Sequence, residues 1–327
     1  MSRNLSVSRE TWPLARPFAI SRGVKTKVDV VVVKISCADS VGWGECVPYP
    51  RYGETVNGVF EDIKKISLDI ENGIDRENLF EKLPAGAARN AIDCALWDLE
   101  AKSSGLRVWE LAGISEPVPV ITAETIGLDT PEIMAENANR LRGAPLIKVK
   151  LNKDDVISRM TAVRESAPSA RIIVDPNEGW TIDQLFRFAP ELKNLGIEMI
   201  EQPIPVTDDN DLIDYSCPIP LCADEACHTT VDLPGLISKY QMINIKLDKT
   251  GGLTEALSLA NEAAQSGFKI MTGCMVGTSL SMAPGTLLGG VSEFVDLDGP
   301  LLLKHDRQSG LDFEDGHVNP PRPELWG

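Results

Sequence analysis

Residues 146–150 read Leu-Ile-Lys-Val-Lys, an apolar run that ends in a charge, and this arrangement returns four more times along the chain. The charges that close the five runs are Lys150, Asp175, Glu201, Asp224 and Lys246. The gaps between them are 25, 26, 23 and 22 residues, enough for one strand, one helix and two loops. Short apolar runs are typical of buried parallel strands, and in a barrel their carboxyl ends would gather these charges, with Lys148, in one mouth.

The same alternation extends on both sides of these runs. We expect eight strands, at residues 118–125, 147–151, 171–175, 197–201, 220–225, 242–247, 269–274 and 294–298. Apolar periodicity predicts helices between them, for example at 155–166, 182–194 and 253–266. A doubly wound sheet collects ligands at one switch point, whereas charges at every strand end favour an α/β barrel.

The first hundred residues lack this repeat and indicate a smaller α+β domain. A β-branched strand at 30–35 is followed by a hairpin partner at 41–46, and helical spacing recurs at 59–70 and 87–101. Pro117 and Pro119 mark the boundary. We therefore expect residues 1–115 to form this domain, with a contribution from the proline-rich segment 300–327, and residues 116–299 to form the barrel.

Composition limits the partners and the location. The 327 residues carry a net charge of −16, so the average surface repels nucleic acid and anionic membrane. The N-terminus has no apolar signal core and no run is long enough to span a bilayer, which predicts a cytoplasmic protein. Seven scattered cysteines do not suggest a disulfide framework, and Cys222, Cys227 and His228 do not complete a zinc ligand set. A homo-oligomer is compatible with the sequence, which does not fix the oligomeric state.

Three acids on successive strands predict a metal site. Asp175, Glu201 and Asp224 could converge on a hard cation, and Mg²⁺ suits such oxygen ligands better than Zn²⁺ because no histidine or cysteine accompanies them at matching positions. The alternative is that each acid caps the helix that follows. Three acids in register across consecutive strands favour the metal.

The lysines around these acids predict proton transfer. Side chains alternate along a strand, so Lys148 and Lys150 lie on the same face. Crowding with other cations disfavours the protonated form of a lysine, so we expect one of them to act as a base near neutral pH. A divalent metal on a substrate carboxylate stabilises the enediolate formed when the neighbouring carbon loses its proton. Lys150 and Lys246 on opposite rims would then address opposite faces of that carbon, which predicts racemisation or epimerisation. A salt-bridge network without catalysis is the alternative, and a similar sequence would produce it.

This pattern resembles the enolase superfamily, and in particular its muconate-lactonizing subgroup. The resemblance rests on five stretches: residues 91–99 (AIDCALWDL), 146–150 (LIKVK), 174–177 (VDPN), 200–203 (IEQP) and 223–225 (ADE). It implies a capping domain, a modified (β/α)7β TIM-like barrel, Mg²⁺ on the three acids, and Lys150 and Lys246 as bases, with Lys148 beside them in the catalytic group.

One branch of the superfamily does not fit the sequence. Mandelate-racemase-like members need a histidine at the end of the seventh strand, but this strand ends in Met-Thr-Gly-Cys at 271–274 and the histidines lie at 228, 305 and 317. The lysine pair leaves dipeptide epimerases, cycloisomerases, o-succinylbenzoate synthases and N-acylamino acid racemases.

The eighth strand narrows the choice. Asp296 and Asp298 share a face, and this Asp-Leu-Asp resembles the site that holds the free α-ammonium of the substrate in L-Ala-D/L-Glu epimerases. The alternative is that one acid caps a helix or pairs with Lys304. Residues 85–91 and 244–252 also resemble the bacterial epimerases.

The resemblance also implies how the rest of the substrate is bound. Arg22, in a loop that closes over the site in this family, resembles the arginine that binds the glutamate side chain, although it lies one residue closer to Pro17-Phe18 than in some members. Arg51, in a second such loop, is the other candidate. Thr125, Cys274 and Val276 are placed beside the dipeptide, and Lys148 is a further binding residue.

We therefore expect a Mg²⁺-dependent epimerase that interconverts L-Ala-D-Glu and L-Ala-L-Glu, a reaction suited to murein peptide recycling. The alternatives are an o-succinylbenzoate synthase or N-acylamino acid racemase, which needs no ammonium site, and a barrel without catalytic activity.

Overall fold

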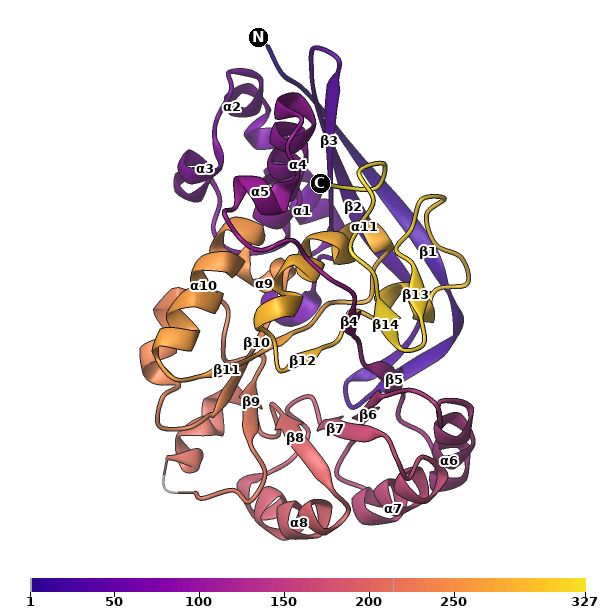
Figure 1. Ribbon diagram of the computed structural model, residues 1–327. Helices are drawn as coiled ribbons and strands as arrows, with labels where there is room; N and C mark the ends of the chain where they lie inside the picture. The colour runs from indigo at the N-terminus through magenta and orange to yellow at the C-terminus, as the bar shows by residue number, and fades with distance from the viewer. Residues whose placement is uncertain (1, 214) are drawn as a thin grey trace.

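The computed structural model describes residues 2–213 and 215–327 (Figure 1). These residues fold into two units, an N-terminal one and a barrel. The first is a three-stranded antiparallel sheet in the order β1 (Asn4–Ile20), β2 (Gly23–Cys37) and β3 (Ser40–Cys46), accompanied by helices. These are the 3-10 turn η1 (Pro50–Tyr52) and the helices α1 (Val56–Lys65), α2 (Ser67–Glu71), α3 (Arg76–Lys82), α4 (Ala87–Ser104) and α5 (Val108–Leu111). The predicted strand at 30–35 and its hairpin partner at 41–46 are confirmed.

Two features of this unit differ from the prediction. Strand β1 was not predicted, because Pro13 and Pro17 interrupt its sequence; its register against β2 shifts between Pro13 and Phe18. The helix expected at 59–70 is divided into α1 and α2, since Ile66 between them has φ −101° and ψ 16°, outside the helical region.

Helix α4 packs directly against β3 because two glycines of that strand leave room for its backbone. A Cβ atom on Gly42 would stand 2.0 Å from the carbonyl oxygen of Ala95, and one on Gly44 would stand 2.0 Å from that of Ala91. Any side chain at either position would push α4 away from the sheet. The two glycines thus fix the distance of α4 from the sheet.

The second unit is a sheet of eight parallel strands, which confirms the barrel prediction. In order, the strands are β5 (Glu124–Ile126), β6 (Leu146–Lys150), β7 (Arg171–Asp175), β8 (Ile197–Glu201), β9 (Leu221–Ala223), β10 (Met242–Ile245), β11 (Lys269–Thr272) and β12 (Phe294–Val295). The backbone N–H of Ala123 donates to the carbonyl of Val295 at 2.7 Å, and this bond links the first strand to the last.

The connections between the strands are partly helical. The helices are α6 (Pro131–Arg140), α7 (Val156–Ser166), α8 (Ile182–Asn194), α9 (Leu247–Thr250), α10 (Leu253–Gln265) and α11 (Ser279–Met282). The 3-10 segments are η2 (Val206–Leu212), η3 (Thr230–Gly235), η4 (Ala283–Val291) and η5 (Gly299–Leu302). Figure 1 shows α6, α7, α8 and α10 on the outside of the strands, while η2 and η3 take the place of helices after β8 and β9.

The segment expected to open the barrel serves two sheets. Within residues 118–125, β4 (Val120–Ile121) pairs with β14 (His317–Val318), which also pairs with β13 (Phe313–Glu314), and the barrel begins only at β5. The C-terminal segment then reaches the first unit, where Arg307 contacts Glu10 at 2.8 Å and the indole of Trp326 donates to the carbonyl of Cys94 at 3.0 Å. Within the described residues, no helix has both the length and the apolar character needed to cross a membrane.

Candidate active site

One buried apolar residue from, or directly beside, each barrel strand closes the interior below the mouth. This floor layer consists of Ala123, Leu146, Ile173, Met199, Cys222, Met242, Met271 and Phe294. Two positions further along each strand, and therefore facing the same way, lies a second layer, the charged ring. Its members are Thr125, Lys148, Asp175, Glu201, Asp224, Asn244, Gly273 and Asp296. Alternation along eight parallel strands thus places the predicted charges above a dry floor.

Lys148 lies at the centre of the charged ring. Its Nζ is 2.5 Å from Glu201, 2.7 Å from Asp296 and 3.4 Å from Asp175, and the side chain is 1% exposed. Burial alone would lower the pKa of Lys148, but the three carboxylates raise it well above its ordinary value. Lys148 is therefore held as an ammonium in this arrangement.

Lys150 and Lys246 stand one layer above the ring on strands that are four apart in the barrel order. Lys150 Nζ donates to Asp175 at 2.5 Å, and Lys246 Nζ donates to Asp224 at 2.7 Å. Burial would lower the pKa of Lys246, but the charges of Asp224 and Glu201 raise it well above its ordinary value. The two amines thus face each other across the mouth, each on a different acid.

The three acids are fully buried and none caps a helix. Helix α8 begins after Thr181, whose side chain caps it, and η3 begins after Thr229. The helix-cap alternative is therefore wrong. Burial raises the pKa of Glu201, whereas Lys150 and Lys148 lower that of Asp175 despite its burial.

As the side chains stand, no group of three acids, histidines or cysteines in the described part of the chain closes around a metal position. Ammonium groups lie between the acids: Lys148 contacts both Asp175 and Glu201, and Lys246 lies 3.6 Å from Glu201 as well as on Asp224. Three buried carboxylates gathered around cations form a hard oxygen donor set, which fits Mg²⁺.

Lys249 belongs to this site and was not predicted. Its Nζ donates to Asp224 Oδ1 at 2.8 Å and to the carbonyls of Asp224 and Asn244 at 2.5 and 2.9 Å, and its side chain is 0% exposed. The three bonds use all its protons and hold the Asp224 carboxylate on the oxygen that Lys246 does not contact. The signal was the Lys-x-x-Lys spacing at 246–249, which brings both lysines to one acid only because α9 starts at Leu247.

A small cavity of about 70 Å³ lies between the two facing amines. Its lining includes Lys150, Lys246 and Asp224, and also Cys274 and Val276 from the loop after β11. Two predicted binding residues thus lie at the cavity. Burial raises the pKa of the Cys274 thiol well above its ordinary value, so this thiol stays protonated.

The two candidate arginines are placed differently. Arg22 lines the cavity and lies 2.8 Å from Glu225, while its guanidinium also donates to the carbonyl of Asn177 at 3.1 Å. Arg51 forms two hydrogen bonds of 2.8 Å with Glu178 and does not line the cavity. Both arginines already have carboxylate partners, but only Arg22 reaches the cavity.

A third cation, Lys25, lies in the same β1–β2 hairpin as Arg22 and was not predicted. It lines the cavity and lies 5.2 Å from the ring centroid of Tyr49, and no acid pairs with it among the described residues. Burial lowers the pKa of Lys25, and the charges of Arg22 and Lys150 lower it further. Its position on the sequence gave little signal, because the β1–β2 register decides which hairpin residue points inward.

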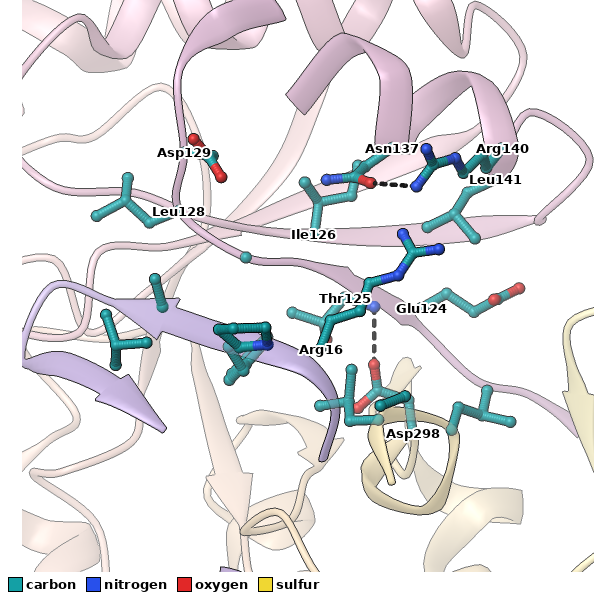
Figure 2. Close-up of a pocket in the computed structure, with 18 residues that line it drawn as sticks. Arg16, Glu124, Thr125, Ile126, Leu128, Asp129, Asn137, Arg140, Leu141 and Asp298 are labelled. Atoms are coloured by element: carbon teal, nitrogen blue, oxygen red, sulfur yellow. Dashed lines mark hydrogen bonds between the residues drawn. The ribbon is translucent and has the colours of Figure 1, made fainter. Parts of the chain in front are cut away.

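The acids of the eighth strand lie at the edge of this site. Asp296 accepts from Lys148 with one oxygen, while its Oδ1 is buried without a hydrogen-bond partner. Asp298 accepts the backbone N–H of Thr125 at 2.7 Å, as Figure 2 shows. Burial raises the pKa of Asp298 to about 7, with the Asp296 charge adding to the effect. Neither acid pairs with Lys304, and although Asp298 stands at the N-cap position of η5, its side chain forms no cap hydrogen bond there, so that alternative is wrong.

Family comparisons cover both units. Residues 2–113 match the mandelate racemase/muconate lactonizing enzyme N-terminal domain, and residues 133–324 match the enolase C-terminal domain-like family. The chain is 46% identical to the L-Ala-D/L-Glu epimerase of Escherichia coli over 97% of this chain and 99% of that one. It is 47% identical to the N-acetyl-D-glutamate racemase of a Pseudoalteromonas species over 91% of this chain and 95% of that one.

Solved structures extend this similarity. An enolase family member from Agrobacterium tumefaciens with homology to dipeptide epimerases, solved with sodium and L-Ala-L-Glu, is 49% identical with a TM-score of 0.97, covering 99% of this chain and all of that one. A dipeptide epimerase from Methylococcus capsulatus, solved with Mg and L-Arg-D-Lys, is 32% identical with a TM-score of 0.92, covering 100% of this chain and 99% of that one.

Proposed function

The chain belongs to the mandelate racemase/muconate lactonizing enzyme family of the enolase superfamily, and we propose that it is a Mg²⁺-dependent dipeptide epimerase that interconverts L-Ala-D-Glu and L-Ala-L-Glu. The observation that carries the proposal is the pair Lys150 and Lys246, which line one cavity from strands four apart in the barrel. Two amines on opposite faces of one carbon are what inversion by proton removal and return requires.

When bound to Asp175, Glu201 and Asp224, Mg²⁺ would offset these acids and the charge that builds on the substrate carboxylate as the α-carbon loses its proton. Lys150 and Lys246 each need a free amine to act as a base, and each now shares its proton with one of these acids. One lysine removes the α-proton, and the other, as an ammonium, returns a proton to the opposite face. Lys148, held by three acids, acts as a hydrogen-bond donor that orients the substrate carboxylate, and it takes no part in the proton transfer.

The ends of a dipeptide find opposite charges at the site. Asp296 and Asp298 supply carboxylates for the α-ammonium, and the unpartnered Oδ1 of Asp296 offers a buried acceptor. For the glutamate side chain, Lys25 is the better candidate than Arg22, because Arg22 is already paired with Glu225 while Lys25 has no acid partner among the described residues. Arg22 then holds the hairpin against Asn177 and adds a second positive charge at the cavity beside Lys25.

N-acetyl-D-glutamate is the second candidate substrate, and the Pseudoalteromonas relative supports it. It shares the glutamate α-carbon and side chain but has no ammonium. Asp296 already contacts Lys148, but Asp298 is buried beside it with no cation partner among the described residues, and a buried carboxylate is costly without one, so the pair favours the dipeptide.

The deciding experiment follows the glutamate α-proton in D₂O with Mg²⁺, using L-Ala-D-Glu and N-acetyl-D-glutamate side by side. We expect exchange and epimerisation of the dipeptide; no exchange at its glutamate α-carbon would refute the proposal. Asp298→Asn separates the two substrates, since it should cripple turnover of the dipeptide and spare that of N-acetyl-D-glutamate. Equal losses on both would remove the ammonium role of Asp298.

We further propose that residues 1–115, with 300–327, form the domain that covers the barrel mouth, and that residues 116–299 carry the chemistry.

We also propose a cytoplasmic role in murein peptide recycling, which suits an Ala-Glu substrate. All seven cysteines are free thiols, as is usual in a reducing compartment.

A further inference from the structure

A second pocket adjoins the catalytic cavity on the side of the eighth strand. It holds about 590 Å³, against about 70 Å³ for the catalytic cavity, and Phe18 lines both. Its lining includes Thr125 and Asp298, which Figure 2 shows joined by their hydrogen bond. The pocket therefore begins at the acid proposed to hold the substrate ammonium.

Two arginines from different elements enter this pocket. Arg16 comes from β1 and Arg140 from the end of α6; in Figure 2 the Arg16 side chain extends toward the guanidinium of Arg140, which points toward Asn137. Arg140 donates to the amide oxygen of Asn137 at 3.2 Å, but no acid pairs with either arginine among residues 2–213 and 215–327. Two guanidinium groups that face one pocket repel each other, and a carboxylate between them would remove that repulsion and accept several N–H bonds.

The rest of the lining suits a short side chain that ends in such a carboxylate. Phe18, Ile126 and Leu141 give the pocket apolar walls for methylene groups. Two further acids, Glu124 and Asp129, also line it, but neither forms an ion pair with the arginines, and Asp129 accepts the N–H of Thr130 at 2.8 Å. The pocket thus presents a buried acid, Asp298, at its floor and two exposed arginines without an acid partner among the described residues.

We propose that this pocket binds the side chain of the substrate's N-terminal residue and selects an acidic one, glutamate or aspartate, through Arg16 and Arg140. The inference rests on the proposed function, because the ammonium bound by Asp296 and Asp298 places the N-terminal residue at the pocket floor. A glutamate side chain then leaves the floor between the apolar walls and brings its carboxylate to the arginines. Alanine at the same position leaves the pocket unused.

The test compares kcat/KM for L-Glu-L-Glu, L-Gln-L-Glu and L-Lys-L-Glu, with L-Ala-L-Glu as the reference. Glutamine matches glutamate in shape, so the ratio of the first two isolates the charge. We expect L-Glu-L-Glu to exceed L-Gln-L-Glu by about tenfold at low ionic strength, and L-Lys-L-Glu to be the poorest.

The variants Arg16→Met and Arg140→Met should each lower that ratio by about threefold, and the double variant should bring it close to one. The matched control is Arg142→Met, which removes an exposed guanidinium two residues away that does not line the pocket and should leave the ratio unchanged.

Each adverse outcome has a distinct meaning. If L-Ala-L-Glu itself is not epimerised, the proposed function fails. If L-Ala-L-Glu turns over but L-Gln-L-Glu equals L-Glu-L-Glu, only the acidic subsite is refuted. Preference for L-Lys-L-Glu would overturn it too, by assigning the pocket to Glu124 and Asp129.

Discussion

A pair of lysines stands on each side of the barrel mouth, and the two sides are built differently. On β6, Lys148 and Lys150 are two positions apart on one strand, whereas on the β10 side Lys246 and Lys249 are three apart across the start of α9. Each pair has one lysine that several acceptors hold and one that hydrogen-bonds a single carboxylate. The proposed bases are the two singly bonded lysines, and the other two support the acids.

The supporting lysines connect their sides to different parts of the molecule. Lys148 reaches Asp296, so the β6 side is coupled to the site proposed for the substrate ammonium. Lys249 reaches Asp224 and the carbonyl of Asn244 on the preceding strand β10. Arg89 of α4 holds the turn that follows Lys249. We therefore expect changes in substrate recognition to affect Lys150 before Lys246, and changes in α4 to affect Lys246 before Lys150.

Removing either base gives the largest expected effect. Lys150→Ala and Lys246→Ala should each lower epimerisation by about 10³-fold, because general base catalysis by a positioned side chain is lost. Each variant should still exchange the α-proton of one epimer in D₂O through the remaining lysine, and the epimer should differ between the two variants. NMR of both epimers measures this.

Lys153→Ala is the matched control, since this exposed lysine follows β6 without entering the cavity and its loss should change neither rate. If both variants lost exchange of the same epimer, the two lysines would not serve opposite faces of the α-carbon.

The sequence predicted both lysines of the β6 side but only Lys246 of the β10 side, for a geometric reason. Side chains alternate with period two along a strand, so Lys148 and Lys150 could be placed on one face, and the acids at strand ends followed from the same rule. Lys249 lies beyond the strand, and only the one-turn helix α9 returns it to Asp224. Lys25 depends on a hairpin whose register shifts between Pro13 and Phe18, so the sequence did not show which of its cations points inward, and the family resemblance favoured Arg22 instead.

Lys249→Met should weaken Mg²⁺ binding by about 10- to 100-fold, since residues that orient metal ligands contribute on that scale. Lys249 does not line the cavity, so KM for the dipeptide at saturating Mg²⁺ should change little. Calorimetric Mg²⁺ titration and kinetics at high Mg²⁺ separate the two effects. An unchanged Mg²⁺ affinity in a folded variant would leave Lys249 without a role at the acids.

The β6 side should show a pH dependence specific to the dipeptide. Because the pKa of Asp298 is raised to about 7, this group is mostly the neutral acid at pH 6 and mostly the carboxylate at pH 8. Only the carboxylate binds an ammonium strongly, so KM for L-Ala-L-Glu should fall by about fivefold as pH rises from 6 to about 7.5. Near pH 8 about half of the dipeptide has lost its ammonium proton, so KM should rise again from there.

Two comparisons assign this pH dependence to Asp298. N-acetyl-D-glutamate carries no ammonium and should not show the fall in KM, and Asp298→Asn should abolish it for the dipeptide. A fall of equal size with both substrates would assign the titration to the lysines instead.

The smallest expected effect concerns the contact between α4 and the β10 side. Arg89 is 5% exposed and donates to the carbonyls of Gly251 and Thr250 at 3.1 and 2.6 Å; a Cβ atom on Gly251 would lie 2.4 Å from its Nε. Arg89→Met leaves these two carbonyls without their donor, which should lower stability by about 1–3 kcal/mol and loosen the turn behind Lys246. Exchange of the epimer assigned to Lys246 should then fall by about threefold, a shift of under 1 kcal/mol in the barrier, while exchange through Lys150 stays the same.

Arg76→Met is the control, because Arg76 stacks on Trp97 and pairs with Glu100 and donates to neither of the two carbonyls. If Arg89→Met slowed both epimers equally, α4 would support the whole barrel mouth and not one base.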